Sequence, residues 1–289
     1  MRNFLLATRP KTLVAAIIPP LMSFMLSVSH HFTVSPYLVV LCILSALCIQ
    51  LATNFFNDLI DFQKGADTFR HGPVRVTSSG LVGQKIIRNW AFGSLIAATL
   101  FALPLIYKGG AIILIPGLLS LYLSYGYTGG PLPLAYKGLG EIFVFLFFGL
   151  FSVFGSYYIY TDSLHPDVLA LASIYGFLTM TLICINNLRD RDEDRKVGKL
   201  TLATRMSETK YKILTLFTIY LPYCFIFLLE GVSNLWWMML ALPVSIKLAK
   251  IVIWEKYEKL NLGLKIAGIH LLVFSLLLYL SLFYEHLFS

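Results

Sequence analysis

Charged residues are scarce in this chain of 289 residues, where Asp, Glu, Lys and Arg together make up 13%. Soluble domains carry nearer 25% charged residues, and the mean hydropathy here is +0.75. No hydrophilic stretch is long enough for a separate soluble domain, and no low-complexity segment occurs. We therefore expect residues 1–289 to form one membrane-embedded domain.

Apolar runs recur along the whole chain, each long enough to cross a hydrocarbon core of about 30 Å. The nine runs cover approximately residues 12–28, 37–60, 86–107, 110–127, 139–161, 167–188, 211–229, 233–253 and 266–284. Backbone groups in lipid must be satisfied within their own segment, so the runs are predicted to be helices. The first run contains Pro19-Pro20 and lacks a small-residue cleavage site, so we expect it to be retained. The sequence thus predicts an all-α polytopic membrane protein with nine transmembrane helices.

The net charge of +8 could suggest a nucleic-acid partner, but the distribution of the basic residues argues against one. With a cytoplasmic N-terminus, 22 of the 23 Lys and Arg residues fall in or beside cytoplasmic loops, and only Lys108 lies outside. Such a bias sets the orientation of membrane proteins. We therefore expect the N-terminus in the cytoplasm, the C-terminus outside, and no nucleic acid.

Cysteine and histidine are also few. The four cysteines have no metal-binding spacing and all fall in apolar runs, which predicts buried free thiols; they are Cys42, Cys48, Cys184 and Cys224. Of the six histidines, His270 lies within a run, and four fall on the predicted outer side: His30, His31, His165 and His286. Only His71 is expected in a cytoplasmic loop, where a lone histidine is more often structural or solvated than catalytic.

Seven of the 15 acidic residues fall in two short segments, 57–67 and 186–194. Each segment ends an apolar run and is followed by basic residues. Asn54, Asp58 and Asp61 are spaced i, i+4 and i+7, which places them on one face of a helix. Three residues of the second segment are spaced i, i+3 and i+7, which also places them on one face of a helix. Burying a charged side chain in a membrane costs free energy, so ionisable residues in membrane helices are rare and usually have a function.

The second set consists of Asn187, Asp190 and Asp194, with Asn186 alongside. Carboxylates at this spacing repel one another unless a cation lies between them, and Mg²⁺ prefers carboxylate and amide oxygens. Two facing sets could hold two or three Mg²⁺ ions with a diphosphate between them. Neighbouring cations could neutralise the remaining phosphate charge: Lys64, Arg70, Arg75, Arg195, Lys196 and Lys199. In contrast, the sign of the charge alternates along residues 191–195, so Arg191, Asp192, Glu193 and Arg195 are expected to form solvated ion pairs.

Five ordered segments of this chain resemble those of a known family. They are Arg9-Pro10-Lys11-Thr12-Leu13; Asn57 to Asp67; Gly72 to Thr77 with Ser79-Gly80; Tyr127 to Pro133 with Leu139-Gly140-Glu141; and Asn186 to Asp190 with Asp194, Gly198-Lys199 and Thr201-Leu202. This set is similar to the UbiA superfamily of intramembrane aromatic prenyltransferases. Within it, the chain most resembles the 1,4-dihydroxy-2-naphthoate prenyltransferases of menaquinone synthesis. It departs from that group's pattern at Val14, Arg191 and Met206-Ser207, none of which is a proposed metal ligand.

The resemblance implies a UbiA-like helix bundle in the bacterial inner membrane, with the active site on the cytoplasmic side. It implies Mg²⁺-dependent transfer of a polyprenyl group from its diphosphate to 1,4-dihydroxy-2-naphthoate with loss of CO₂, giving demethylmenaquinone. The metal ligands would be Asn54, Asp58, Asp61, Asp67, Asn187, Asp190 and Asp194. The catalytic carboxylates would be Asp58, Asp61, Asp190 and Asp194, and the diphosphate would contact Asn57, Lys64, Arg75 and Lys199.

Several interpretations stay open at this point. Tyr122, Tyr125 and Tyr127 lie near the predicted site and could steady an allylic cation, but aromatic residues make up 15% of the chain and none is singled out. Lys137 and Glu141 could close the site or hold the aromatic acid. A 4-hydroxybenzoate acceptor is the nearest alternative activity. An ion transporter is disfavoured because the acids lie at one membrane face, and a CDP-alcohol phosphotransferase because its opening motif is missing.

Overall fold

The computed structural model describes residues 2–66, 72–230 and 235–288, which contain helices and no strands. Eight helices are long and apolar enough to cross a membrane by length and composition: 10–29, 36–63, 84–109, 140–161, 167–196, 208–228, 236–254 and 257–284. A ninth apolar helix, Ala111–Gly126, is shorter. Each coincides with one predicted run, so the all-α polytopic fold is confirmed.

The chain also contains short helical segments that the apolar pattern does not separate. The elements are α1 (Arg2–Thr8), α2 (Pro10–Ser29), α3 (Pro36–Gln63), α4 (Gln84–Gly109), α5 (Ala111–Gly126), η1 (Leu134–Tyr136), α6 (Gly140–Val144), η2 (Phe145–Phe151), α7 (Ser152–Thr161), α8 (Asp167–Lys196), α9 (Leu202–Arg205), α10 (Glu208–Phe225), η3 (Ile226–Leu228), η4 (Leu235–Ala241), α11 (Leu242–Trp254), η5 (Tyr257–Lys259) and α12 (Leu260–Phe288).

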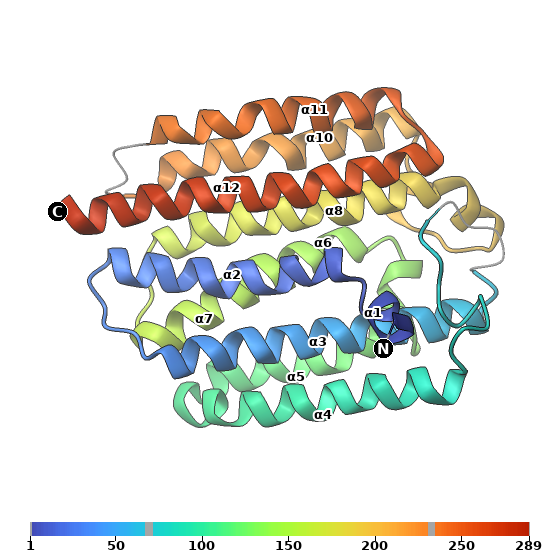
Figure 1. The fold of residues 1–289 in the computed structure, drawn as a ribbon, viewed down its shortest axis with the longest axis horizontal. Helices are drawn as coiled ribbons and strands as arrows, with labels where there is room; N and C mark the ends of the chain where they lie inside the picture. Colours follow the sequence, from blue (N-terminus) through green and yellow to red (C-terminus); the bar gives the residue numbers. More distant parts are fainter. Residues whose placement is uncertain (1, 67–71, 231–234, 289) are drawn as a thin grey trace.

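The long helices lie side by side along the longest axis of the molecule (Figure 1). Helices α3, α4 and α5 pack together on one side, and α10, α11 and α12 form the other. Between them lie α2, the α6–η2–α7 span and α8, and α8 contacts elements of both the central layer and the α10–α12 side. Within its most apolar window α8 is 72% buried, whereas α4 is 17% buried. Helix α8 is therefore a central helix, and α4 presents most of its surface outward.

Both acidic segments lie at the same end of this bundle, at the C-terminal ends of α3 and α8 (Figure 1). The N-terminus also lies toward this end, and the C-terminus lies at the opposite one (Figure 1). Lys108, the one basic residue expected outside, is at the far end of α4, where its Nζ lies 2.6 Å from Asp162 Oδ2. The charge asymmetry read from the sequence therefore corresponds to the two ends of the folded bundle.

The span predicted over 139–161 contains a π-helical segment, η2, between two α-helical parts. Such wide turns within a membrane helix are found often at functional sites. Gly149, in η2, is buried against α8, and a Cβ there would lie 2.5 Å from the Ala172 carbonyl oxygen and 2.7 Å from Gly176 Cα. Only a glycine permits this close approach of the two backbones, which holds the wide turn against the central helix.

A short helix precedes the first span, and the turn after it was not predicted. Arg9 occupies the left-handed region with φ of 49°, and Pro10 then begins α2 at the position where proline is best tolerated. Asn54 of α3 stabilises this turn, because its Nδ2 donates to Thr8 O at 2.9 Å and to Thr12 Oγ1 at 3.0 Å. The turn therefore directs α1 across the acidic end of the bundle.

The cysteines are free thiols, as expected. Cys42 and Cys184 are buried and Cys48 is half-buried. The expectation of burial is wrong for Cys224, which is exposed on α10. Membership of an apolar run does not distinguish a core-facing position from an outward-facing one, because lipid tolerates the same side chains as a protein interior.

Candidate active site

Two carboxylates of the first acidic segment, Asp58 and Asp61, anchor a loop onto the end of α3. Asp58 is 1% exposed, and its two oxygens accept the backbone N–H groups of Val76 at 3.3 Å and Thr77 at 3.0 Å. One turn later, Asp61 Oδ2 accepts from Arg75 Nη2 at 3.2 Å. The loop that carries Arg75 is therefore held by both carboxylates, and Arg75 is itself buried.

Asp61 also joins the first acidic segment to the second. Lys199 Nζ lies 3.4 Å from Asp61 Oδ2 and 3.8 Å from Asp194 Oδ1. The other oxygen, Asp61 Oδ1, accepts the Tyr136 hydroxyl at 2.9 Å. A single ammonium thus lies between carboxylates from α3 and α8, so the structure brings the two predicted segments together. Charge-assisted contacts of this kind are roughly twice as strong as neutral ones.

Tyr136, in η1, lies close to two lysines of the site. Lys64 Nζ lies 3.9 Å from the centre of its ring, and Lys199 Nζ lies 5.4 Å from it. Both distances are in the range of cation–π interaction. Lys64 also donates to Thr128 O at 2.8 Å, and Thr128 Oγ1 donates to Asn57 Oδ1. Three loops that are far apart in sequence therefore meet at this ring.

Burial affects two groups at this end of the bundle. Partial burial lowers the pKa of Lys64, an effect that the nearby Asp61 opposes. Burial raises the pKa of Tyr127 far above its ordinary value, and the negative charges of Glu141, Asp61 and Asp194 add to the rise. Tyr127 is consequently a neutral phenol at any physiological pH. Its aromatic neighbours in the sequence, Tyr122 and Tyr125, are exposed.

In the second acidic segment, Asp190 is held by the preceding residue. Arg189 Nε lies 2.6 Å from Asp190 Oδ1, and Arg189 Nη2 lies 2.7 Å from Oδ2, which is a two-pronged pair. The same guanidinium donates to Asn186 Oδ1 and Asn261 Oδ1, both at 2.8 Å. Arg189 is 1% exposed. A buried arginine that satisfies this many acceptors fixes the end of α8 relative to α12.

Asn187 points to a different partner from the other residues of its segment. Its Nδ2 donates to Glu141 Oε1 at 2.9 Å, and the Tyr211 hydroxyl donates to the same oxygen. Glu141 is 1% exposed, and its Oε2 has no hydrogen-bond partner in the described residues. The contact joins α6, α8 and α10. Glu141 therefore has a structural role here, as the buried acceptor that links the three helices.

The remaining predicted residues fall into three groups. Asn54, predicted as a metal ligand, uses its amide for the α1–α2 turn and for accepting Gln50 Nε2 at 3.1 Å. Asp67 lies outside the described residues, as do Arg70 and His71. In the segment of alternating charge, Arg191 pairs with Asp192 at 3.4 Å, as expected, and also donates to Ala203 O. Arg195 donates to Thr204 O. The metal-ligand assignments themselves remain predictions.

Sequence reasoning did not single out Tyr136 or Arg189. Tyr136 is one of 16 tyrosines, and its only distinguishing signal is its position in the loop between the fourth and fifth apolar runs. Arg189 lies within the second acidic segment, but its position next to Asp190 in the sequence does not indicate that both side chains are buried and paired. Adjacent residues on a helix usually point about 100° apart, so a bidentate contact between them is not expected from spacing.

A cavity of about 1220 Å³ extends from this cluster between the two sides of the bundle. Its polar end is lined by Arg9, Lys11, Asn54, Asp58, Arg75, Tyr127, Asn186 and Arg189. Its apolar wall includes five phenylalanines of the α6–η2–α7 span: Phe143, Phe147, Phe148, Phe151 and Phe154. It reaches Ile112 and Leu164, which lie toward the opposite end. The volume exceeds the roughly 300–1,000 Å³ of ordinary ligand pockets, so the cavity suits a long apolar molecule with an anionic head.

The donor set at the polar end fits Mg²⁺. Four carboxylates of α3 and α8 lie among basic side chains, and their oxygens are the hard ligands that this ion requires. The cluster contains no thiolate or imidazole ligand among the described residues, which would favour softer metals. Asp58, Asp61 and Asp194 are each less than 9% exposed, as expected for ligands that share a dication with a substrate.

Proteins with assigned functions are similar in sequence to this chain. The chain is 36% identical over 183 residues to a 1,4-dihydroxy-2-naphthoate octaprenyltransferase of Haemophilus influenzae, a match that covers 61% of this chain and 59% of that protein. It is 33% identical over 260 residues to the Escherichia coli protein of the same name, covering 86% of this chain and 83% of the relative. The first match thus spans less than two thirds of its relative, and the second spans most of it.

Solved structures show the same fold at low sequence identity. A UbiA homologue from Archaeoglobus fulgidus bound to DMAPP and Mg²⁺ superposes with a TM-score of 0.63 at 16% identity, covering 97% of this chain and 99% of that one. A UbiA homologue from Aeropyrum pernix K1 in its apo form gives 0.67 at 14% identity, covering 93% and 95%. Residues 16–262 match the model of the UbiA prenyltransferase family, and the chain belongs to that family.

Proposed function

We propose that this protein transfers a polyprenyl group from polyprenyl diphosphate to 1,4-dihydroxy-2-naphthoate, with loss of CO₂, in menaquinone biosynthesis. The observation that carries the proposal is a long apolar cavity whose polar end is lined by Asp58 and Arg75. Beside it, Lys199 joins the carboxylates of α3 and α8. The matched naphthoate octaprenyltransferases support the choice of acceptor. The alternative acceptor, 4-hydroxybenzoate, has no comparable support.

The diphosphate head would bind between the ends of α3 and α8. Mg²⁺ held by Asp58, Asp61, Asp190 and Asp194 would neutralise negative charge on the departing diphosphate. Lys64, Arg75 and Lys199 would contact its oxygens, and such preorganised charges stabilise a transition state in which charge develops on the leaving group. Asn57 would keep Lys64 in place through their shared partner, Thr128.

The isoprenoid tail would lie along the apolar wall of the cavity. The phenylalanines of η2 and α7 exclude water there, which protects an allylic cation from hydrolysis. The neutral Tyr127 lines the cavity beside the head-group site, and its aromatic ring would stabilise that cation.

The reaction then exchanges one bond to carbon for another. The C–O bond between the prenyl C1 and the diphosphate breaks. The carbon of the electron-rich acceptor ring that carries the carboxylate attacks C1 and forms the new C–C bond. The carboxylate leaves as CO₂, and its bonding electron pair restores the aromatic ring. The product is a prenylated naphthoquinol, the reduced form of demethylmenaquinone.

The orientation of the protein follows from its charges. The bundle end that carries the acidic segments also carries nearly all Lys and Arg residues, and such residues accumulate on the cytoplasmic side. We therefore assign the active site and the N-terminus to the cytoplasmic face of a bacterial inner membrane. Cysteine accessibility mapping tests this assignment, because a cysteine introduced near Lys199 would be labelled only from the cytoplasmic side.

Substitution of the acidic residues tests the site. Asp58→Ala and Asp190→Ala are expected to abolish turnover with polyprenyl diphosphate and 1,4-dihydroxy-2-naphthoate, while the protein remains folded in the membrane. Asp192→Ala is the matched control on α8, because Asp192 is half-exposed and contacts Arg191 rather than the cluster. Normal turnover in either of the first two variants would contradict the metal-site assignment.

A further inference from the structure

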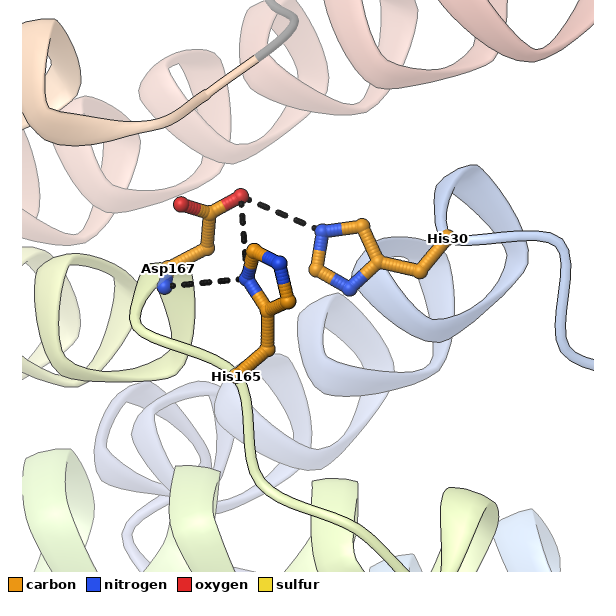
Figure 2. A group of neighbouring side chains, drawn as sticks. All are labelled: His30, His165 and Asp167. Carbon is orange, nitrogen blue, oxygen red and sulfur yellow. Dashed lines mark hydrogen bonds and ion pairs between the residues drawn. The ribbon is translucent and has the colours of Figure 1, made fainter.

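A second polar cluster lies at the end of the bundle opposite the acidic segments (Figure 2). His30 follows the last residue of α2, His165 lies in the α7–α8 loop, and Asp167 is the first residue of α8. Asp167 is 1% exposed, whereas the two imidazoles are partly accessible. The proposed prenyl transfer uses none of these three residues.

One potential ligand atom of each side chain lies close to those of the other two. Asp167 Oδ2 lies 3.1 Å from His30 Nε2 and 3.6 Å from His165 Nδ1, and all three atoms lie within 4.8 Å of one another. In a tetrahedral zinc site with bonds of about 2.0–2.2 Å, neighbouring ligand atoms lie roughly 3.3–3.6 Å apart. The present spacing therefore needs only a small adjustment to accept such an ion.

A backbone amide also contacts the imidazole of the α7–α8 loop. The backbone N–H of Asp167 lies 3.3 Å from His165 Nδ1, and the same Nδ1 lies 3.6 Å from the buried carboxylate oxygen Asp167 Oδ2 (Figure 2). An imidazole nitrogen has one lone pair in the plane of its ring, so a cation bound to Nδ1 would replace the contact with this N–H. The carboxylate oxygen beside it would be a second ligand of the same ion.

The other atoms of the cluster are held as in an established metal site. His30 Nδ1 lies 2.7 Å from the Tyr157 hydroxyl, so the outer nitrogen of this ring has a partner that orients it. Asp167 Oδ1 accepts the backbone N–H of Glu230 at 3.1 Å, which leaves Oδ2 to face the imidazoles. Metal-binding imidazoles and carboxylates are nearly always oriented by such outer contacts.

We propose that His30, His165 and Asp167 form a binding site for a divalent transition metal of the Zn²⁺ type. Imidazole nitrogens with one carboxylate suit Zn²⁺, whereas Mg²⁺ prefers all-oxygen sets, so this site and the acidic segments select different ions. Three protein ligands leave a fourth position for water. The bound ion fastens the end of α2 to the α7–α8 loop and to the start of α8.

Zinc titration of the purified full chain in nanodiscs, with any affinity tag removed, tests this site. Calorimetry in saturating Mg²⁺ would count the Zn²⁺ ions bound per chain, and the absorption spectrum of Co²⁺ would report nitrogen ligation. The wild type is expected to bind one Zn²⁺ more than His165→Asn and Asp167→Asn. His165 is partly exposed, so its substitution is expected to leave the fold intact, which normal prenyl transfer by this variant would verify.

His31→Asn is the matched control, because His31 neighbours the cluster but lies outside the group of ligand atoms. Its φ is 63°, a left-handed conformation that Asn tolerates well. This variant is expected to bind Zn²⁺ like the wild type. Tyr157→Phe removes the hydroxyl that orients His30, and it is expected to weaken Zn²⁺ binding by about 10–100-fold.

Thermal unfolding provides an independent measurement. Zn²⁺ is expected to raise the unfolding temperature of the wild type and of His31→Asn, and to leave that of His165→Asn unchanged. The proposal is overturned if the wild type binds no Zn²⁺ in saturating Mg²⁺, which would indicate that the cluster shares only protons. It is equally overturned if His165→Asn and Asp167→Asn bind as many Zn²⁺ ions, as tightly, as the wild type.

Discussion

Replacing Asp61 with Asn would remove a negative charge that several side chains of the head-group site contact. The carboxylate accepts from Tyr136 and contacts the cations of Arg75 and Lys199, and its side chain is 3% exposed. The amide keeps the shape of the carboxylate but loses the charge and replaces one acceptor oxygen with a donor. Its NH₂ group would face Arg75 and Lys199 or the Tyr136 hydroxyl, whichever way it turns.

The size of the expected loss follows from the burial of the Asp61 side chain. Removing one partner of a buried ion pair costs about 3–5 kcal/mol. Lys199 is 16% exposed and keeps a second carboxylate, Asp194, at 3.8 Å. The free-energy cost of losing the Asp61 charge therefore lies in the lower part of that range. Loss of one preorganised electrostatic group from a transition state costs about 2.7–4 kcal/mol. We therefore expect kcat for prenyl transfer to fall by about 10²–10³-fold.

Single-turnover measurements at saturating prenyl diphosphate and Mg²⁺ would determine this loss, with circular dichroism to verify the helical fold. Asp192→Asn is the matched control, since Asp192 is 47% exposed and its contacts with Arg191 and with the Tyr257 hydroxyl lie outside the head-group cluster. Surface ion pairs contribute about 0–1 kcal/mol, so this variant should stay within a few-fold of wild type. Activity of Asp61→Asn within threefold of wild type, or an equal fall in the control, would refute the reasoning.

Three further predictions concern packing, buried hydrogen bonds and pH. Gly149→Ala places a methyl group against a backbone oxygen of α8 and should lower the unfolding temperature, at a cost of about 1–3 kcal/mol; an unchanged melting curve would count against the close approach. Glu141→Ala leaves the donors of Asn187 and a tyrosine unsatisfied at about 1–3 kcal/mol each, and Glu141→Gln, which keeps an acceptor, should lose less in the same thermal assay; equal losses would contradict this. Because burial lowers the pKa of Lys64 and only its charged form binds an anion, KM for the prenyl diphosphate should rise as pH increases through that lowered value, and Lys64→Arg should abolish the rise. A KM that responds identically to pH in both proteins would exclude this role.

Local sequence patterns predicted the fold and the proximity of the two acidic segments. Long apolar runs can be satisfied in lipid only as helices, so each run corresponds to one helix in the structure. The helical spacing of Asp58 and Asp61 predicted a shared face, and both do contact the loop that carries Arg75. Their position at a run's end, together with the charge asymmetry, predicted that both acidic segments lie at one face.

Contacts between distant segments could not be predicted in the same way. The ring of Tyr136 lies close to both Lys64 and Lys199, but the three residues are separated by two or more helices in sequence. The pairing of Arg189 with Asp190 depends on burial against α12, which spacing along α8 does not reveal. The wide turn of η2 depends on how closely Gly149 approaches α8. Each of these features is a property of tertiary packing.

The central claim is tested most directly by turnover of the purified protein in nanodiscs with a polyprenyl diphosphate and Mg²⁺. One reaction would contain 1,4-dihydroxy-2-naphthoate and another 4-hydroxybenzoate, each with an EDTA control. Our account predicts a prenylated, decarboxylated naphthoquinol in the first reaction and its loss with EDTA. Product only from 4-hydroxybenzoate would contradict the assigned acceptor, and no product or diphosphate release from either would contradict prenyl transfer itself.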